Sequence, residues 1–160
     1  MAEILPERAE LVRRCRAQQE YGARVVLTNG TYDLLHVGHL RSLVDARSRG
    51  DLLVVGVNAD SSVRAYKGPG RPIVPEAERC EVLAALACVD FVHVFAEPDV
   101  VALLRALRPD VYAKGRDYTL ETLPEREVAE EVGAEIAFVG DPKEHSVTDI
   151  LQRVRELLKE

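Results

Sequence analysis

Apolar and polar positions follow two rhythms along this chain: short continuous apolar runs, and apolar residues spaced three or four apart. The runs are typical of strands covered on both faces, and the spaced positions are typical of amphipathic helices. Five strands are predicted at residues 24–29, 52–58, 90–95, 110–114 and 134–139. Helices are predicted at residues 6–21, 40–49, 60–66, 75–88, 99–107, 123–132 and 146–159.

The near alternation of strands and helices predicts an α/β fold, a Rossmann-like doubly wound sheet of five parallel strands in three α/β/α layers. The strand at 134–139 is short and alternating, so we expect it near an edge of the sheet. We expect one domain over residues 1–160, with an N-terminal helix within 1–22 and a C-terminal helix at 146–159. The apolar positions of that last helix are expected to face inward; they are Ile150, Leu151, Val154, Leu157 and Leu158.

Composition narrows the classes of protein that this chain can belong to. With 47% hydrophobic and 30% charged residues it is typical of a globular protein, and a net charge of −6 argues against a polyanionic partner such as DNA. No apolar run approaches the length of a membrane span and the first residues do not resemble a secretion signal, so we expect a cytoplasmic protein. The glycine-rich dinucleotide motif and the P-loop motif are both missing from the sequence.

The main polar cluster, residues 28–39, lies between the first predicted strand and its helix. Ligands of open α/β sheets bind at this place, and the helix start offers N–H donors to a phosphate. Gly30 and Gly38 allow backbone to approach a ligand closely. His36 and His39 are three residues apart and can turn toward one phosphoryl group, although a surface residue and a helix cap would give the same pattern. A metal site is not predicted, because these histidines have no third ligand at zinc-type spacing.

The string Gly-Thr-Tyr-Asp-Leu-Leu-His-Val-Gly-His at residues 30–39 resembles the His-x-Gly-His signature of the cytidylyltransferase-like nucleotidyltransferases. The resemblance covers residues 24–151. It implies that a phosphate oxygen of a small substrate attacks the α-phosphorus of a nucleoside triphosphate, and that pyrophosphate leaves with Mg²⁺. The attacking phosphate is already ionised at neutral pH, so the protein has mainly to align the reactants and neutralise charge.

The resemblance also implies roles for individual side chains. His36, His39 and Lys67 are the expected catalytic residues, with the histidines at the α-phosphate and the lysine at the phosphates. Ser146 and Thr148, at the start of the last helix, are expected to hold the β- and γ-phosphates. Without the resemblance, the loop at 67–72 is an ordinary connection and Ser146 an ordinary helix cap.

A second polar cluster, residues 114–117, follows the fourth predicted strand at the same edge of the sheet and is either a wall of the same pocket or a charged surface turn. Arg79 matches a recurrent family position, with a surface ion pair as the alternative. The residues expected to contact the nucleotide are Asn29, Gly30, Thr31, Tyr32, His36, Gly38, His39, Lys67, Lys114, Gly115, Ser146 and Thr148. Those expected to contact the second substrate are Asp33, Arg79, Arg116 and Asp117.

Within the family, the signature together with Lys67-Gly68 and the 114–118 cluster looks most like the adenylyltransferase half of the bacterial bifunctional ADP-heptose synthase. This implies ATP and a heptose 1-phosphate as substrates, a separate sugar kinase upstream and a homodimer. Cytidylyltransferases for glycerol 3-phosphate carry arginines where this chain has Ala87 and either Asp141 or Lys143, which weakens that alternative. An FMN adenylyltransferase and a nucleotide-binding module without turnover are the remaining alternatives.

Overall fold

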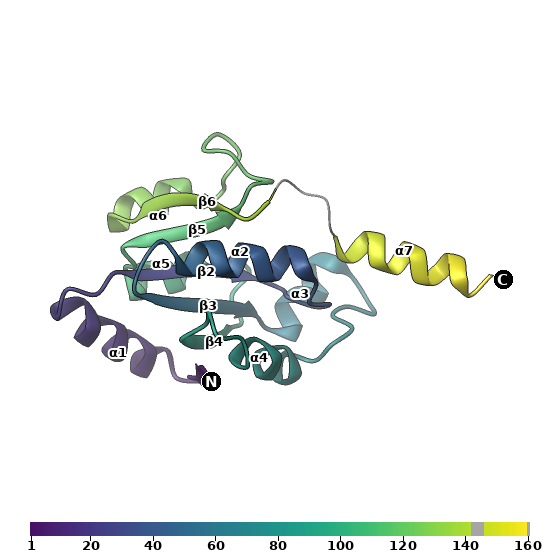
Figure 1. Cartoon of the computed structure of the whole chain (residues 1–160), viewed down its shortest axis with the longest axis horizontal. Helices are drawn as coiled ribbons and strands as arrows, with labels where there is room; N and C mark the ends of the chain where they lie inside the picture. Colours follow the sequence, from purple (N-terminus) through teal and green to yellow (C-terminus); the bar gives the residue numbers. More distant parts are fainter. Residues whose placement is uncertain (142–145, 160) are drawn as a thin grey trace.

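The continuous apolar runs form the strands of a single parallel sheet, with helices on both of its faces (Figure 1). The computed structural model describes residues 1–141 and 146–159. Its strands are β1 Glu3–Ile4, β2 Val25–Gly30, β3 Leu52–Asn58, β4 Phe91–Phe95, β5 Val111–Gly115 and β6 Glu135–Val139. They lie in the order β1-β4-β3-β2-β5-β6, and each pair of neighbours is parallel. The position of β6 at an edge confirms the prediction.

The helices are α1 Arg8–Glu20, α2 Val37–Arg47, α3 Asp60–Lys67, α4 Glu76–Ala84, α5 Val101–Leu107, α6 Arg126–Val132 and α7 Val147–Leu157. Helices α2 and α4 pack on one face of the sheet and α1, α5 and α6 on the other, which confirms the predicted three-layer architecture. One apolar core packs Leu43 of α2 and Leu83 of α4 against the sheet. The other packs Leu11 of α1, Leu104 of α5 and Ala129 of α6 against the opposite face.

The sheet has six strands rather than the predicted five, because the short segment β1 pairs with β4 at the other edge. Just after β1, the backbone N–H of Leu5 donates to the carbonyl of Val92 in β4 at 2.8 Å, which continues the pairing. Two residues are too few to show an alternating pattern, and Ile4 is 44% exposed. The sequence pattern therefore had no signal for this strand.

Helix α2 begins at Val37, three residues before the predicted start at residue 40. Gly38 and His39 therefore lie in its first turn, and His36 is the residue that precedes it. Glycine and histidine contribute nothing to an apolar repeat, so the pattern could not place this boundary. The first turn of α2 consequently carries one of the two predicted histidines into the strand-to-helix junction.

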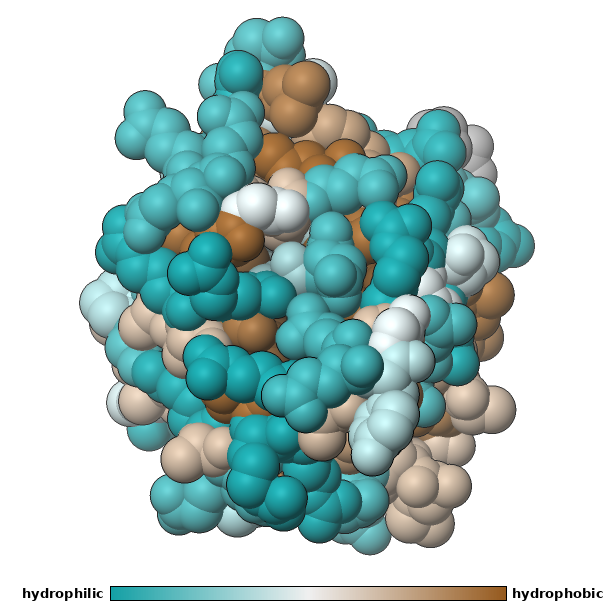
Figure 2. Space-filling model, turned by 90° about the vertical axis from the view of Figure 1, so that its left-hand side faces the viewer, coloured by the Kyte–Doolittle hydropathy of each residue, from teal (hydrophilic) through white to brown (hydrophobic). Residues whose placement is uncertain are grey.

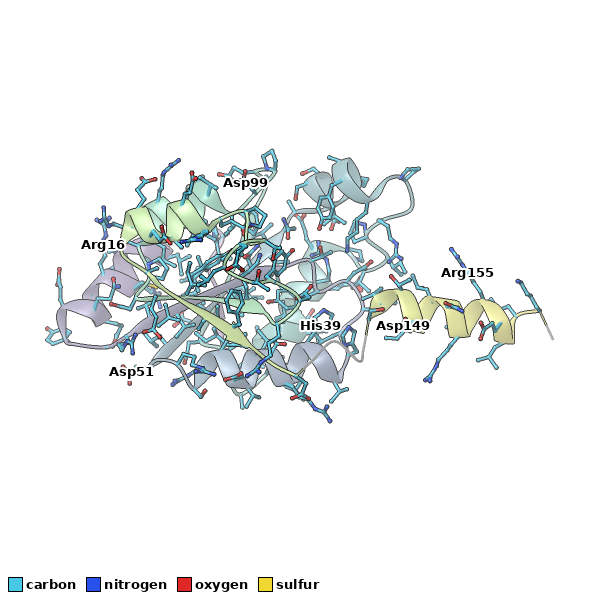
Figure 3. The ribbon with its side chains drawn as sticks, turned by 90° about the horizontal axis from the view of Figure 1, so that it is seen from above. Arg16, His39, Asp51, Asp99, Asp149 and Arg155 are labelled. Carbon is cyan, nitrogen blue, oxygen red and sulfur yellow. The ribbon has the colours of Figure 1, made fainter. Side chains whose placement is uncertain are left out.

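The prediction that the apolar residues of α7 face inward is wrong. None of the described residues of α7 is buried. Val154 is 45% exposed and Leu157 70%, and Leu158, which follows the helix, is 81% exposed. The helix extends away from the sheet, and the labelled Arg155 lies far from the other elements (Figures 1 and 3). The apolar repeat predicted the helix correctly, but it did not show whether the apolar face packs against the rest of the protein. The loop predicted at 140–145 and Lys143 lie largely outside the described residues.

The amino ends of the strands lie at the left of Figure 1, at the opposite end of the sheet from the junction between β2 and α2. That face is mostly hydrophilic, with its apolar residues separated by polar ones (Figure 2). Asp51 and Asp110 accept hydrogen bonds there from the backbone N–H groups of Arg24 and Val25, both at 2.8 Å.

Within the described part of the chain, no helix combines the length and the apolarity needed to cross a membrane.

Candidate functional site

The carboxyl ends of β2, β3, β5 and β6 and the segment after β4 surround a cavity of about 640 Å³, which the starts of α2 and α7 also line. It brings together nearly every residue that the sequence marked as a site residue. Those that line it are Asn29, Gly30, Thr31, Tyr32, Asp33, His36, Gly38, His39, Lys67, Lys114, Gly115, Arg116, Asp117, Ser146 and Thr148. Arg79 is the exception among the predicted site residues.

The signature loop packs around the ring of Tyr32. This residue adopts a left-handed backbone conformation, φ +51°, and is 9% exposed. Its ring lies edge-on to the His39 ring with centroids 5.4 Å apart. A Cβ at Gly30 would stand 3.2 Å from the Tyr32 ring, closer than side chains normally pack. The close approach of the ring favours glycine at residue 30, and the buried tyrosine packs against His39.

His36 and His39 stack on one another, with ring centroids 3.9 Å apart and planes inclined by 30°. The backbone N–H of His36 donates to Nδ1 of His39 at 3.4 Å, so the proton of the neutral His39 ring is on Nε2. Burial, then the nearby His36 and Lys67, lower the pKa of His39 to about 4. At neutral pH His39 is therefore an uncharged ring that can donate from Nε2 to an oxygen of a ligand.

The start of α7 brings hydroxyl and backbone donors to the same cavity. Ser146 Oγ accepts from the Asp149 N–H at 3.1 Å and donates to Asp149 Oδ2 at 2.7 Å, which caps the helix. Val147 and Thr148 follow it on the cavity wall. In Figure 3 the first turn of α7 lies beside His39. Two helix starts thus lie at one place, where each is favourable for a phosphate.

Lys67 ends α3 and lies at the rim of the cavity, next to the signature loop. The preceding residue, Tyr66, forms a hydroxyl–hydroxyl hydrogen bond with Thr31, which joins α3 to that loop. Partial burial and the nearby charge of Arg71 lower the pKa of Lys67. A cation close to other positive charges is stabilised by an anion, so the surroundings of Lys67 favour a phosphate ligand.

The Asp33 carboxylate faces the loop of residues 71–74 and anchors it. It accepts from Arg71 Nη1 at 2.9 Å and from the N–H groups of Ile73 and Val74 at 2.7 and 2.9 Å. Burial favours the neutral acid, but the Val74 and Arg71 hydrogen bonds outweigh it and keep the pKa of Asp33 below its usual value. Because both oxygens are engaged, we expect Asp33 to position this loop rather than to bind a substrate.

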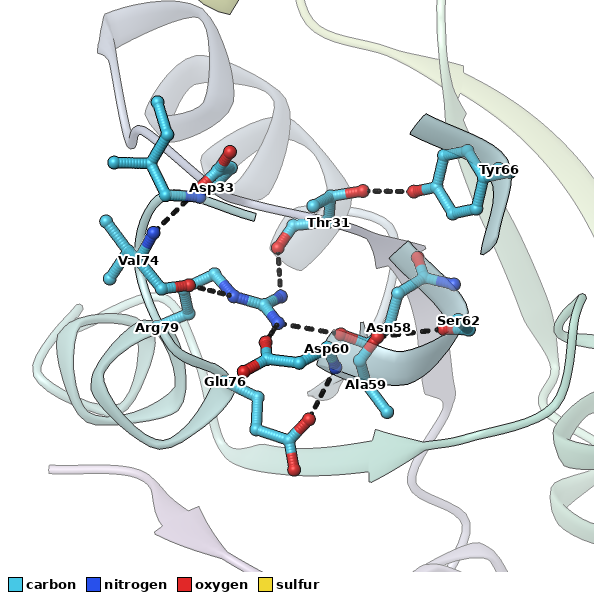
Figure 4. Close-up of polar contacts among 11 residues, drawn as sticks. Thr31, Asp33, Asn58, Ala59, Asp60, Ser62, Tyr66, Val74, Glu76 and Arg79 are labelled. Atoms are coloured by element: carbon cyan, nitrogen blue, oxygen red, sulfur yellow. Dashed lines mark hydrogen bonds and ion pairs between the residues drawn. The ribbon is translucent and has the colours of Figure 1, made fainter. Parts of the chain in front are cut away.

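Arg79 connects three segments behind the cavity wall (Figure 4). Its guanidinium donates to the carbonyls of Thr31, Asn58 and Val74 and pairs with the Asp60 carboxylate at 2.7 Å. At 2% exposure it is not a surface ion pair, and it does not line the cavity. We expect Arg79 to hold the signature loop against β3, because every polar atom of its guanidinium already has a partner there.

The wall formed by β5 ends at Gly115, where a Cβ would lie 2.6 Å from Asp117 Oδ1. The cavity wall also includes polar residues that were not predicted as site residues, among them Asn58, Asp99 and Glu125. Asn58 is the last residue of β3, and Asp99 follows β4, so their positions at strand ends could have marked them as candidates. Glu125 is ten residues beyond β5, and only the path of the intervening loop brings it to the cavity.

The chain is similar to known proteins over most of its length. A family model described as cytidylyltransferase-like matches residues 27–156. Two relatives named bifunctional protein HldE, from Geotalea uraniireducens and Geobacter sulfurreducens, are 48% identical over 140 residues and 47% identical over 138. The alignments cover 88% and 86% of this chain but 29% and 28% of those relatives, so the chain spans less than a third of their length. A solved structure of a lipopolysaccharide core biosynthesis protein from Thermoplasma volcanium matches with a TM-score of 0.64 and 27% identity, over 76% of this chain and 100% of that one.

Proposed function

Because this chain belongs to the cytidylyltransferase-like family of nucleotidyltransferases, as the match over residues 27–156 establishes, we propose that it transfers AMP from ATP to a heptose 1-phosphate. The products are ADP-heptose and pyrophosphate. The observation that carries the proposal is the meeting of His36, His39, Lys67 and the start of α7 around one cavity. The similarity to the HldE proteins over most of the chain supports the heptose phosphate as acceptor.

In the proposed reaction an oxygen of the acceptor phosphate forms a bond to the α-phosphorus, and the bond from that phosphorus to the bridging oxygen breaks. Pyrophosphate carries away the electron pair of the broken bond. His39 donates from Nε2 to an α-phosphate oxygen whose charge grows in the transition state. Lys67 and the donors at Ser146 and Thr148 hold the leaving phosphates. No proton has to be removed from the acceptor, because its phosphate is already ionised.

Mg²⁺ fits this site as part of the nucleotide complex. The predicted phosphate-binding part of the cavity presents imidazole, ammonium and hydroxyl groups, and the residues described contain no cluster of three or more His, Cys, Asp and Glu side chains arranged to hold a metal. Mg²⁺ is commonly carried by phosphate oxygens and water rather than by an all-protein cage. Bound to the triphosphate, it would neutralise charge on the leaving pyrophosphate.

The test is pyrophosphate release with matched pairs of substrates. ATP with heptose 1-phosphate should give the largest kcat/KM. The comparison pairs are CTP with glycerol 3-phosphate and ATP with flavin mononucleotide. A higher kcat/KM for either comparison pair would replace the proposed acceptor, and nucleotide binding without any turnover would indicate a binding module.

The kcat of the His39→Ala variant in the same assay shows whether pyrophosphate release arises at this site. We expect kcat to fall about 10²–10³-fold, as it does when one donor to a developing oxyanion is removed. Ser48→Ala, at the other end of α2 and outside the cavity lining, is the matched control and should leave kcat unchanged. Full activity of the His39 variant would contradict the assignment of the signature. The homodimer and the separate upstream sugar kinase implied by the resemblance remain predictions.

A further inference from the structure

A buried polar cluster lies on the cavity wall formed by the ends of β2 and β5. Tyr112 donates its hydroxyl to Asn29 Oδ1 at 2.8 Å, and Lys114 Nζ donates to the same oxygen at 3.2 Å. The Lys114 ammonium is also 5.1 Å from the centre of the Tyr118 ring. Burial lowers the pKa of Lys114, and the nearby Glu125 opposes that effect. The ammonium also lies 5.7 Å from the centre of the Tyr112 ring, so it is held between two aromatic rings and one amide.

Glu125 completes this cluster and has an unused acceptor. The residue is 9% exposed and lines the cavity. Its Oε1 lies 3.7 Å from Lys114 Nζ, which is a charge contact longer than a hydrogen bond. Its Oε2 is buried and has no hydrogen-bond partner among the residues that the structure describes. A buried carboxylate oxygen without a donor is costly, so a donor is expected from whatever fills the cavity.

The chemistry of this cluster favours hydroxyl groups over a phosphate. The carboxylate of Glu125 repels anions and accepts hydrogen bonds, whereas the ammonium of Lys114 donates them. Side by side, they match two neighbouring hydroxyl groups, each of which is both a donor and an acceptor. The cavity then has two chemical ends: imidazole, ammonium and helix-start donors for phosphates, and a carboxylate–ammonium pair for a polyol.

We propose that Glu125, together with Lys114, binds a pair of neighbouring sugar hydroxyls in this cavity. The inference rests on the proposed function, because that function supplies two such pairs, on the ribose of the nucleotide and on the acceptor sugar. Both sources share one chemistry, and the experiment separates them. Glu125 acts as a binding residue in this scheme and takes no part in the transfer of the nucleotidyl group.

The first arm measures nucleotide binding by calorimetry in the absence of an acceptor. The ligands are ATP, 2′-deoxy-ATP and 3′-deoxy-ATP, each with Mg²⁺, and the proteins are wild type and Glu125→Gln. If the ribose is the source, wild type should bind ATP about 10- to 100-fold more tightly than a deoxy analogue, because the analogue leaves the buried carboxylate unpaired. Glu125→Gln should lose most of this discrimination.

The second arm measures the KM for the acceptor in the pyrophosphate assay. If the acceptor sugar is the source, Glu125→Gln should raise that KM about 10- to 100-fold and leave the relative affinities for the three nucleotides unchanged. Glu125→Asp, which keeps the charge but withdraws it by one methylene group, should show the same selective loss. Glu127→Gln, an exposed acid on α6, is the matched control and should change neither quantity.

The inference is overturned if Glu125→Gln leaves both the ribose discrimination and the acceptor KM as they are in wild type. It is also overturned if all ligands weaken equally while the melting temperature falls, because Glu125 would then serve only to neutralise Lys114. The binding arm needs no turnover. Ribose discrimination without pyrophosphate release from any acceptor would therefore refute the proposed function and leave this inference standing.

Discussion

Helices α2 and α7 both begin at the cavity, but they are supported in opposite ways. Leu43 and Ala46 bury one side of α2 against the sheet, at 1% and 0% exposure. In α7 no described residue is buried, and Leu157 is 70% exposed. Each helix start presents donors to the same space, His39 in one case and Ser146 in the other. One of the two proposed phosphate-binding elements is thus part of the packed scaffold, whereas the other buries none of its described residues.

This difference indicates how the two helices contribute to binding. An isolated helix of about 11 residues is only marginally stable in water, so α7 gains order mainly from what it contacts. A nucleotide that bridges the two helix starts would supply such a contact. We therefore expect α2 to be ready before the nucleotide arrives and α7 to become ordered as it binds, at some cost in affinity.

The largest difference between the helices should appear in stability. Leu43→Ala should lower the free energy of unfolding by about 2–5 kcal/mol, because it leaves a cavity in a packed core. Leu157→Ala should change it by less than about 0.5 kcal/mol, since that side chain is mostly in water. Urea unfolding followed by circular dichroism measures both. A similar loss for the two variants would mean that the apolar face of α7 is covered.

The second difference concerns pH, because the start of α2 carries His36 and His39, whereas the described residues at the start of α7 include no imidazole. The folded protein keeps His39 neutral, with a pKa of about 4 against 6.5 for the free side chain. The unfolded chain therefore binds a proton first, and stability should be complete above pH 6.5 and fall as the pH drops toward 4. The loss should be on the order of 2 kcal/mol, allowing for the part of the ring that water reaches. Urea titrations across this range measure the free energy of unfolding at each pH. His39→Gln should make that free energy less dependent on pH. An unchanged dependence would mean that other groups cause it.

The third difference concerns amide hydrogen exchange with and without ATP and Mg²⁺. Amides of α7 should exchange rapidly in the free protein and about tenfold more slowly at a nucleotide concentration ten times Kd, which corresponds to about 1.4 kcal/mol. Amides of α2 should remain unexchanged over the same period in both samples. Equal protection of α7 before and after nucleotide addition would contradict the idea that the ligand orders it.

The smallest effect expected is that of the α7 cap. Ser146→Ala removes the acceptor for the Asp149 N–H and should cost about 1 kcal/mol, which is about a fivefold weaker affinity for ATP. Gln152→Ala, on the same helix but outside the cavity lining, should leave the affinity unchanged. Calorimetry measures both variants. Equal affinities for the Ser146 variant and wild type would exclude this helix start from the nucleotide site.

The elements that the sequence predicted well are those with a long apolar pattern. Strand β3 was predicted at residues 52–58 and is observed as Leu52–Asn58. Strand β1 was missed because a two-residue pairing has no period. The early start of α2 was missed because its first turn contains glycine and histidine, whose placement depends on Tyr32 and the loop beneath it. Patterns predict that elements exist more reliably than where they end.

The candidate site likewise contains residues that a local sequence pattern predicted and contacts that no local pattern predicted. Residues adjacent to strand ends, such as His36 and Lys114, were predicted and line the cavity, because parallel strands end at one edge. The side-chain partners were not predictable: Asp33 faces residues 71–74, and Arg79 lies behind the wall. Glu125 reaches the cavity only through the course of the loop after β5. Contacts between residues far apart in sequence leave no local signal.

By itself, the sequence determined the parallel α/β sheet, the edge of the sheet at which the cavity lies and the family of the chain, because these follow from local patterns and from one uninterrupted motif. Only the tertiary structure decided which polar groups are already engaged, which carboxylate oxygen is left without a donor, and that α7 leaves the body of the protein. Those properties depend on distances between segments and on burial. Neither is encoded at any single position, since both arise when separate elements pack together.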